Sequence, residues 1–340
     1  MSGLRQLTVA GLFGYKKSLE ETQNVDGKLE VYDLFCGAGG FSTGAAAAGC
    51  HVAFACDSDE NALETHRRNH PTCKHACLTL PSDRIPFPTD GRRFHVHGSP
   101  PCQMFSNQCT LSRKPGDRDK PCNLIQWFLE TALTCGATSF SMEEVGHPEV
   151  VKVVKSVQRR FPGKLAFAVV NFEKLGVPQT RKRLIAGSPE LICHLLRREK
   201  TTRRRSVQDA ILYPWGTHIN NGKNWTDRKL RRNRKPYESK YIYKKAGWTD
   251  NCRPVDQPSP TIVATRSQYW VRVHETRHDK KQLEVEESAA LQTYPLTYKW
   301  PENKSFAVRQ IGNSVPPLIA ETIMRFYTED RASQNVDASS

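Results

Sequence analysis

The sequence predicts an α/β fold: a doubly wound, mostly parallel sheet with a second, smaller domain. The main observation is that short apolar segments alternate repeatedly with segments of helical periodicity. A glycine-rich turn after the first apolar segment indicates a strand that passes directly into a helix. The chain has 340 residues, 38% of them hydrophobic and 25% charged, which is typical of a folded chain.

The predicted elements follow from this alternation. The first unit is a strand over 29–35, a tight turn over 37–40, a helix over 41–48 and a strand over 51–56. The next elements are a strand over 94–97, a helix over 124–135, a strand over 138–142, a helix over 148–160 and strands over 166–171 and 183–187. After Ser188 basic, Asn-rich and Pro-rich sequence predicts the smaller domain, up to about Lys281. Helices over 285–292 and 317–327 restore the pattern, and the polar tail is expected to fray.

Positive charge is concentrated in one stretch. Lys and Arg number 50 against 35 Asp and Glu, a net charge of +15. Residues 197–235 hold 13 of these bases and 3 acids, so that 13 − 3 gives +10 in this stretch. Tyr213, Trp215 and Trp225 are interleaved with the bases, which suits phosphate contacts and base stacking. A solvated basic loop or a localisation signal around 203–205 is the alternative.

Several classes of protein are disfavoured. No apolar run is long enough to span a membrane, and the N-terminus lacks the features of a secretion signal. The 11 cysteines include no Cys-x-x-Cys pair, which indicates free thiols in a reducing compartment. His95 and His97 lack a third ligand at usable spacing, so no metal is expected. We expect an intracellular protein, nuclear in a eukaryote and cytoplasmic in a bacterium.

The glycine-rich turn is a candidate cofactor site. Gly37, Gly39 and Gly40 stand between the first strand and its helix, where backbone can approach a ligand closely. Asp57 ends the next strand, where doubly wound folds present a carboxylate to ribose hydroxyls. The glycine spacing departs from Gly-x-Gly-x-x-Gly, which disfavours a nicotinamide cofactor. A purely structural turn is the alternative.

Cys102 is a candidate nucleophile. Pro100 and Pro101 fix the backbone just before this thiol, in a loop at the carboxyl edge of the sheet. A buried, inert cysteine is the alternative. Glu143 closes another strand and Arg183 begins another, so that a carboxyl and a guanidinium are expected at the same edge.

In this order, the motifs resemble those of the cytosine carbon-5 DNA methyltransferase family. The matching blocks are Asp33 to Phe41, Pro100 to Gln103, Glu143 to Val145, Gln179 to Arg183, Leu291 to Pro295 and Gln310 to Pro317. The resemblance implies a target-recognition region between the fourth and fifth blocks, where the basic stretch lies. The implied segments are an N-terminal arm (1–28), a catalytic domain (29–188), a basic target-recognition domain (189–281), a return to the catalytic domain (282–327) and a polar tail (328–340).

The resemblance implies transfer of a methyl group from S-adenosylmethionine to carbon 5 of cytosine in double-stranded DNA, on a flipped base. Cys102 is then the nucleophile, Glu143 contacts ring nitrogen 3, and Arg183 contacts oxygen 2. Arg181, also assigned to the catalytic group, is expected to hold phosphate or the active-site loop. The implied cofactor-binding residues are Phe35, Gly37, Gly39, Gly40, Phe41, Asp57, Pro100, Asn313 and Val315. The implied nucleic-acid-binding residues are Gln103, Ser106, Arg231, Arg232, Arg234 and Arg266.

Two other functions stay open at this point. One is the same chemistry on structured RNA such as transfer RNA, although the Cys-Phe-Thr tripeptide of that branch is absent. The other is a catalytically silent DNA-binding regulator. Glu144, Ser58 and Cys77 depart from the family pattern, and two carboxylates facing one pocket would raise a pKa. The segment 256–261 is expected to read bases or to intercalate. No protein partner is predicted.

Overall fold

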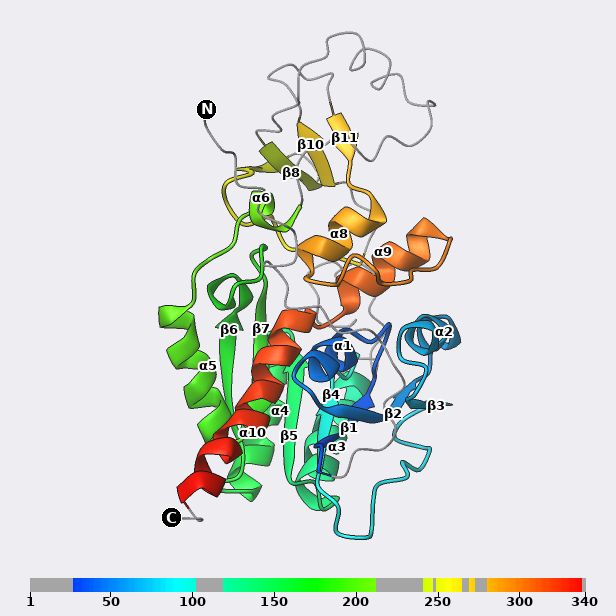
Figure 1. Ribbon diagram of the computed structural model, residues 1–340, viewed down its shortest axis with the longest axis vertical. Coiled ribbons are helices and arrows are strands. Elements are labelled where there is room, and N and C mark those ends of the chain that lie inside the picture. The colour runs from blue at the N-terminus through cyan, green and yellow to red at the C-terminus, as the bar shows by residue number, and fades with distance from the viewer. Residues whose placement is uncertain are drawn as a thin grey trace, which may run out of the picture.

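The computed structural model describes residues 27–101, 119–211, 241–246, 249–264, 269–272 and 280–337. Its larger part is built on a seven-stranded sheet, and its smaller part on a four-stranded sheet. In Figure 1 the small sheet lies beyond one end of the main sheet, with short helices between the two. The carboxyl edge of the main parallel strands faces this junction.

The first half of the main sheet comes from the N-terminal third of the chain. Its elements are β1 (Glu30–Leu34), α1 (Gly40–Ala47), β2 (His51–Asp57), α2 (Glu60–Asn69) and β3 (Lys74–Cys77). The predicted strand, turn, helix and strand are therefore confirmed within one or two residues. The helix α2 is not among the predicted elements, because most of its surface is charged. Asp59 begins this helix, because its side chain accepts a hydrogen bond from the Asn61 N–H at 3.0 Å.

The second half continues the alternation predicted from the sequence. Its elements are β4 (Phe94–Gly98), α3 (Asp119–Thr134), β5 (Ser139–Glu144), α4 (Pro148–Arg160), β6 (Ala166–Asn171), the 3-10 turn η2 (Phe172–Leu175) and β7 (Lys182–Gly187). The strand order is β3-β2-β1-β4-β5-β7-β6, and β7 is antiparallel to both of its neighbours. The doubly wound, mostly parallel sheet is therefore confirmed. Its order reverses between β1 and β4, where such sheets bind ligands.

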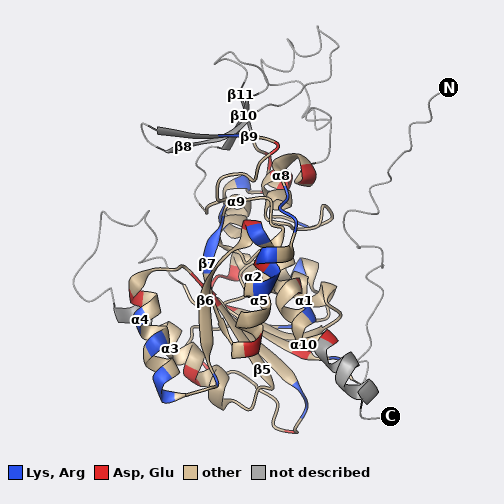
Figure 2. Cartoon of the chain, turned by 90° about the vertical axis from the view of Figure 1, so that its left-hand side faces the viewer, with Lys and Arg blue, Asp and Glu red and all other residues tan. Residues whose placement is uncertain are grey.

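Helices cover both faces of the main sheet, as the edge-on view in Figure 2 shows. The helices α3 and α4 pack on one face, in a core that includes Phe128, Met142 and Val154. On the other face lie α1 and the long C-terminal helix α10 (Pro317–Asp337), in a core that includes Phe41 and Ile319. A Cβ at Gly44 would collide with the Pro317 carbonyl, so this glycine permits the close contact between α1 and α10.

The prediction that regular alternation ends after Ser188 is wrong for the next thirteen residues. They form α5 (Pro189–Thr201), which the Ser188 hydroxyl caps by accepting the Leu191 N–H at 3.2 Å. Leu191, Ile192 and Leu195 are buried against the main sheet. The basic residues Arg197, Arg198 and Lys200 lie in the last turns of this helix, after the apolar stripe, where the basic stretch 197–235 begins. The division of the chain into domains stays a prediction.

The prediction of a frayed tail after Tyr327 is also wrong, because α10 continues to Asp337. Arg325 forms ion pairs with Glu321 at 2.8 Å and with Glu329 at 2.9 Å, each four residues away. Such pairs stabilise a polar helix by a few tenths of a kcal/mol each, roughly. No described helix is both long and apolar enough to cross a membrane.

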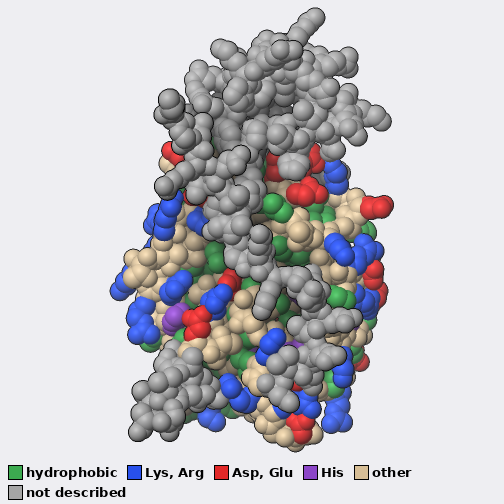
Figure 3. Space-filling view, viewed as in Figure 1, with side chains coloured by type: hydrophobic (Ala, Val, Ile, Leu, Met, Phe, Trp, Pro, Cys, Tyr) green, Lys and Arg blue, Asp and Glu red, His purple; other side chains and the backbone are tan. Residues whose placement is uncertain are grey.

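The smaller part follows α6 (Val207–Ala210). Its sheet has the order β11-β10-β8-β9 and is antiparallel throughout, with β8 (Tyr241–Ala246), β9 (Thr249–Pro254), β10 (Tyr269–Arg272) and β11 (Lys280–Gln282). The helices α8 (Val285–Leu291) and α9 (Lys304–Asn313) join it to the main part through a third apolar core. On the face seen in Figure 3, basic and acidic side chains of the described surface are interspersed.

Candidate active site

The glycine turn after β1 has a backbone shape that few residues other than glycine adopt. Gly37 and Gly39 have φ values of 54° and 91°, and Phe35 has a φ of 59°. Asp57, at the end of β2, reaches across to this turn, and its Oδ2 accepts the Gly37 N–H at 2.8 Å. The candidate cofactor residues Phe35, Gly37 and Asp57 therefore lie together at the carboxyl edge, beside the point where the strand order reverses.

The glycines of the turn serve two different purposes. A Cβ built on Gly37 would meet nothing within 4 Å, so this position faces open space. A Cβ on Gly39 would lie 2.9 Å from His66 Cδ2 and 3.0 Å from Tyr298 Oη, and one on Gly40 would collide with the Val315 carbonyl. Packing against neighbouring residues therefore requires Gly39 and Gly40, whereas at Gly37 the positive φ favours glycine and the Cβ position faces open space.

Asp33, on β1, fixes the first turn of α1 through two hydrogen bonds from Ser42. Its Oδ2 accepts the Ser42 N–H at 3.2 Å and the Ser42 hydroxyl at 2.6 Å. Burial raises the pKa of Asp33 to about 7, and the bonds from Ser42 counteract that rise. Burial likewise raises the pKa of Asp57 above its ordinary value. Both carboxylates thus fix the turn through hydrogen bonds to its backbone.

The remaining candidate cofactor residues do not all face this space. The Phe41 ring is 2% exposed and stacks on His97 with centroids 3.5 Å apart, so it lies in the core. Val315 is buried and Asn313 is exposed. Pro100 is buried just after β4, close to the end of β1. Burial excludes the Phe41 ring from the groups that a ligand at the edge can touch.

The chain reaches the candidate nucleophile from the centre of the edge. Gly98, the last residue of β4, pairs with Leu34 of β1 and with Met142 of β5. A Cβ at Gly98 would collide with the Phe128 ring, which crosses beneath the strand end. Ser99 to Pro101 then leave the sheet between the turn after β1 and the end of β5. Cys102, Gln103 and Ser106 lie outside the described residues.

Glu143 and Arg183 meet at the same edge, on the antiparallel neighbours β5 and β7. Arg183 Nε lies 3.1 Å from Glu143 Oε1, with side-chain exposures of 19% and 7%. Arg183 also donates to its neighbour's carbonyl, Lys182 O, at 2.8 Å. Glu143 Oε1 accepts no aligned hydrogen bond among the described residues. The structure thus brings the predicted carboxyl and guanidinium together, with acceptor capacity left at the carboxyl.

Glu144, the departure from the family pattern, points the other way. Successive side chains of a strand alternate between faces, so Glu144 shares the face of Phe140 and Met142. Its Oε2 accepts the N–H of Val145 at 2.6 Å. The two carboxyls therefore point to opposite faces of β5 and do not share one pocket.

Arg181, expected among the catalytic residues, lies elsewhere in the structure. Its side chain is buried and donates to Ile262 O at 3.1 Å, to Gly312 O at 3.2 Å and to Ser314 O at 3.1 Å. Arg181 is 2% exposed and its side chain is directed at these main-chain carbonyls, so it is buried away from the surface that a DNA phosphate can reach. Arg181 is a positioning residue that ties the start of β7 to two segments more than 80 residues away.

Gln179 extends this connection, although the sequence does not mark it as a site residue. Its amide donates to Leu291 O at 2.9 Å and to the Gln292 side chain, and its Oε1 accepts the Ile262 N–H at 2.9 Å. Gln292 in turn donates to Ile311 O and Ser314 O, each at 2.9 Å. We call Gln179, Arg181 and Gln292 the polar hub. Three of the six sequence blocks therefore meet in one buried network.

The segment 256–261 is expected from the sequence to contact bases, but half of it is used in packing. Ser259 is buried and bridges to Gln179, and the Thr180 N–H donates to Ser259 O at 2.8 Å. Thr261 donates to the Thr180 carbonyl. Asp256 and Gln257 stay exposed. The candidate DNA contacts Arg231, Arg232, Arg234 and Arg266 lie outside the described residues.

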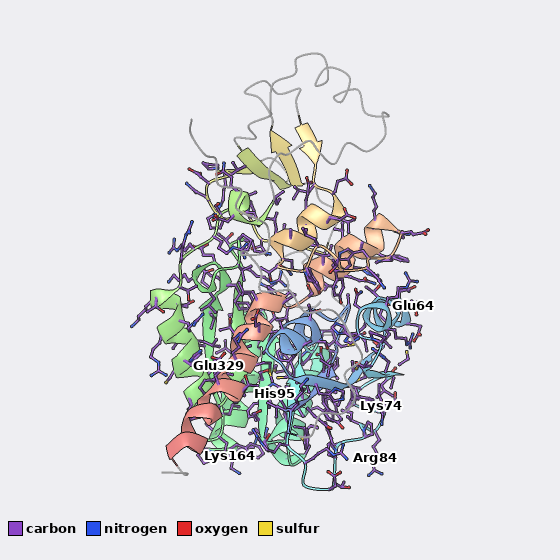
Figure 4. All side chains as sticks on the ribbon, in the orientation of Figure 1. Glu64, Lys74, Arg84, His95, Lys164 and Glu329 are labelled. Atoms are coloured by element: carbon purple, nitrogen blue, oxygen red, sulfur yellow. The ribbon has the colours of Figure 1, made fainter. Side chains whose placement is uncertain are left out.

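A buried ladder of histidines and serines, which the sequence does not predict, links β4 to β5. His95 contacts the hydroxyls of Ser139 and Ser141 at 2.8 and 2.9 Å, and His97 contacts those of Ser141 and Ser99 at 2.9 and 3.1 Å. Figure 4 labels His95 near the centre of the molecule, and its ring centroid lies 5.2 Å from that of Tyr327 on α10. Burial lowers the pKa of His95 to about 3, so this imidazole is neutral.

The sheet order, the glycine turn and the polar edge are those of a methyltransferase fold. The chain belongs to the family of C-5 cytosine-specific DNA methylases, whose family model matches residues 29–328. This family and its fold are S-adenosylmethionine-dependent methyltransferases. The resemblance inferred from the six blocks is therefore confirmed.

Relatives of similar length support the family. M1.HphI, a Type II methyltransferase of Haemophilus parahaemolyticus, is 26% identical over 324 residues that cover 87% of this chain and 85% of that protein. M.HgiDI of Herpetosiphon aurantiacus, also a Type II methyltransferase, is 24% identical over 323 residues that cover 90% and 97%. The structure of the S. pombe Dnmt2 methyltransferase matches with a TM-score of 0.58 at 14% identity and covers 89% of this chain and 99% of that one. At that identity the match shows the fold alone.

Proposed function

We propose that this chain transfers the methyl group of S-adenosylmethionine to carbon 5 of cytosine in double-stranded DNA. The observation that carries the proposal is the Glu143–Arg183 pair, 3.1 Å apart at the edge where β4 leads toward Cys102. A carboxyl and a guanidinium paired at this edge suit the activation of a pyrimidine ring by a thiol. Membership of the C-5 cytosine-specific DNA methylase family supports the same assignment.

In this proposal Cys102 is the nucleophile. Its thiolate adds to carbon 6 of cytosine, which forms a carbon–sulfur bond and moves electron density to carbon 5. After methylation, carbon 5 loses its proton to solvent, the carbon–sulfur bond breaks, and the thiolate is regenerated. The target base has to leave the duplex for this attack, at a cost of a few kcal/mol, roughly.

Glu143 and Arg183 hold the ring during these steps. The Glu143 carboxyl bonds to ring nitrogen 3 and supports the charge that develops there on thiolate addition. Arg183 bonds to oxygen 2, using guanidinium N–H groups that the Glu143 contact through Nε leaves available. The ion pair between the two side chains keeps both pointing to the same space.

The turn after β1 fits the cofactor. S-adenosylmethionine, when bound, supplies an electrophilic methyl group. Gly37 gives the backbone room for a ligand, and the Asp57 carboxylate retains lone pairs for ribose hydroxyls besides the bonds it accepts from Gly37 and Asp59. The Asp57 side chain thus both shapes the turn and orients the ribose.

The basic stretch supplies the DNA contact in this proposal. Arg231, Arg232 and Arg234 bind duplex phosphates without regard to sequence. Reversal of all three to Glu should weaken binding to every sequence and lower the log–log salt slope by roughly 0.9 for each phosphate that is no longer neutralised. An unchanged slope in a folded variant would assign the stretch to solubility or localisation.

The proposal is tested by transfer of labelled methyl groups from S-adenosylmethionine to duplex DNA and to transfer RNA in parallel. The wild-type chain should label the duplex, and Cys102→Ser should not, because a hydroxyl is far less acidic and less nucleophilic than a thiol. Duplex DNA with 5-fluorocytosine should trap the wild-type chain covalently but not the variant. The matched control is Cys193→Ser, an exposed free thiol on α5, which should keep full activity.

Each outcome separates the candidate functions. Labelling of transfer RNA alone would replace the DNA proposal with the RNA alternative. Binding of duplex DNA with no transfer to either substrate would favour a silent regulator. Turnover by Cys102→Ser close to the wild-type rate would mean that the nucleophile is another residue.

A further inference from the structure

A cluster of three potential metal ligands, two imidazoles and one thiol, lies next to the glycine turn after β1. His66 comes from α2, Cys73 from the turn that follows it and His75 from β3, the edge strand of the main sheet. One donor atom from each of the three lies within 4.8 Å of the others. Figure 4 locates the two elements through Glu64 on α2 and Lys74 on β3.

The spacing of the donors is close to that around a bound ion. His66 Nδ1 and His75 Nε2 are 2.8 Å apart. With zinc–nitrogen bonds of about 2.0 Å in a tetrahedral site, two ligating nitrogens lie about 3.3 Å apart. Separation of the two rings by roughly half an ångström therefore admits an ion between them. His75 is only partly buried, so the cluster is open to solvent on one side.

The other nitrogen of His66 is oriented by the protein. His66 Nε2 lies 2.9 Å from Ser42 Oγ, and this hydroxyl donates to Asp33 Oδ2 at 2.6 Å. Since the hydroxyl proton goes to Asp33, Ser42 Oγ accepts from the His66 Nε2–H. The lone pair of the neutral imidazole is then on Nδ1 and accepts the His75 Nε2–H. An ion that binds between the two rings takes the place of this proton, and the neutral His75 ring then carries its proton on Nδ1. Metal-ligating histidines are commonly held by such a second hydrogen bond.

The protonation states also suit a metal. Burial lowers the pKa of His66 and of His75, so both rings are neutral near pH 7, the form that ligates. Burial raises the pKa of the Cys73 thiol, whose Sγ lies 3.3 Å from the Lys74 carbonyl oxygen. A divalent ion displaces the thiol proton and forms a metal–thiolate bond in its place.

We propose that His66, Cys73 and His75 form a structural binding site for Zn²⁺, with water in the fourth position. Two imidazoles and one thiolate are ligands that zinc accepts and that calcium and magnesium do not favour. The ion would join α2 to β3 and, because the His66 ring packs beside Gly39, brace the cofactor turn. The three ligands lie within ten consecutive residues of the sequence, but the expectation that no metal binds considered His95 and His97 and not these three residues together.

The test uses the full chain, stripped with a chelator and titrated with Co²⁺ and, separately, with Zn²⁺. We expect one equivalent of Co²⁺ to bind, with tetrahedral d–d bands and a thiolate-to-cobalt charge-transfer band, and Zn²⁺ to displace it. Cys73→Ser should lose the charge-transfer band. Ser42→Ala should keep the band but bind Co²⁺ more weakly, by about 10- to 100-fold, because His66 loses its orienting bond.

The control is Cys50→Ser, which removes a buried thiol outside the cluster and should leave the spectrum unchanged. Since Cys73→Ser alters a buried position, His75→Gln on the partly exposed edge strand is the second variant, and it should lose stoichiometric binding. Absence of a charge-transfer band in the wild-type chain would overturn the proposal. Retention of the band in Cys73→Ser, or of one tightly bound equivalent in His75→Gln, would overturn it as well.

Discussion

In the half of the carboxyl edge formed by β1 and β2, the carboxylates of Asp33 and Asp57 accept hydrogen bonds from the backbone of the segments that follow these strands. Asp33 accepts the Ser42 N–H at 3.2 Å, and Asp57 accepts the N–H groups of Gly37 and Asp59 at 2.8 and 2.9 Å. In the half formed by β5 and β7, Glu143 meets one guanidinium, and its Oε1 has no aligned hydrogen bond in the described part of the chain.

The difference shows where the protein has left polar capacity for an incoming group. A buried acceptor without a hydrogen bond costs about 1–3 kcal/mol, so it persists only where another interaction offsets that cost. The first half uses its carboxylates to shape a turn, which prepares a backbone surface for a ligand. In the proposed function, the second half keeps the Glu143 carboxyl for the target base, and the polar hub joins the start of β7 to segments far along the chain.

The largest effect is expected from Glu143→Gln, which tests whether the carboxyl on β5 serves catalysis and not stability. The amide keeps the size of the side chain but loses the carboxylate charge and the proton exchange at ring nitrogen 3. We expect kcat to fall by about 10³-fold, which corresponds to about 4 kcal/mol, with the unfolding free energy nearly unchanged. Single-turnover methyl transfer and urea denaturation measure the two quantities. A fall in the free energy of unfolding with normal turnover would mean that Glu143 stabilises the fold and does not act on the base.

Arg181→Ala should show the reverse pattern. Removal of the guanidinium leaves three buried carbonyls without this donor, and we expect the free energy of unfolding to fall by about 3 kcal/mol. Arg183→Ala, two residues away and partly exposed, is the matched control and should lose activity with a much smaller change in stability. Denaturation midpoints that moved equally in the two variants would contradict the separate roles of these arginines.

These two arginines also show how far the sequence leads. The order and spacing of the blocks predict Asp57, Glu143 and Arg183 at strand ends, because a parallel sheet gathers such ends at one edge. Nothing local distinguishes Arg181 from Arg183, since the carbonyls that Arg181 binds lie 81 to 133 residues further along. The burial of Phe41 likewise depends on packing against residues far along the chain, such as His97.

In the half of the edge formed by β1 and β2, Asp33 should make the free energy of unfolding depend on pH. The pKa of Asp33 is about 7 in the folded chain, above its ordinary value of 3.8, because the carboxyl is buried. Between these values the folded state holds a proton that the unfolded state has released. The contribution of Asp33 to stability is therefore fully present below about pH 4 and is lost as the pH rises to about 7, with a fall of roughly 2 kcal/mol between about pH 5 and 6.5.

Urea denaturation of the wild-type chain and of Asp33→Asn between about pH 4 and 8 measures this contribution as a difference. Asparagine keeps an acceptor for Ser42 but does not titrate, so the wild-type chain should lose stability relative to the variant across that interval and not above it. Asp256→Asn, an exposed position, is the control and should run parallel to the wild-type chain. A constant difference between the wild-type chain and Asp33→Asn would mean that burial does not raise this pKa.

The smallest effect on turnover is expected from Glu144→Gln. Glu144 directly follows Glu143, where the largest effect is expected. Glu144 lies on the opposite face of β5, and its Oε2 accepts the Val145 N–H at 2.6 Å, a bond that the glutamine carbonyl can retain. Turnover should stay within about threefold of the wild-type rate, less than about 0.7 kcal/mol in barrier height. Measured beside Glu143→Gln under the same single-turnover conditions, this variant tests whether strand alternation separates the two carboxyls. A loss close to that of Glu143→Gln would mean that Glu144 takes part in the chemistry despite its direction.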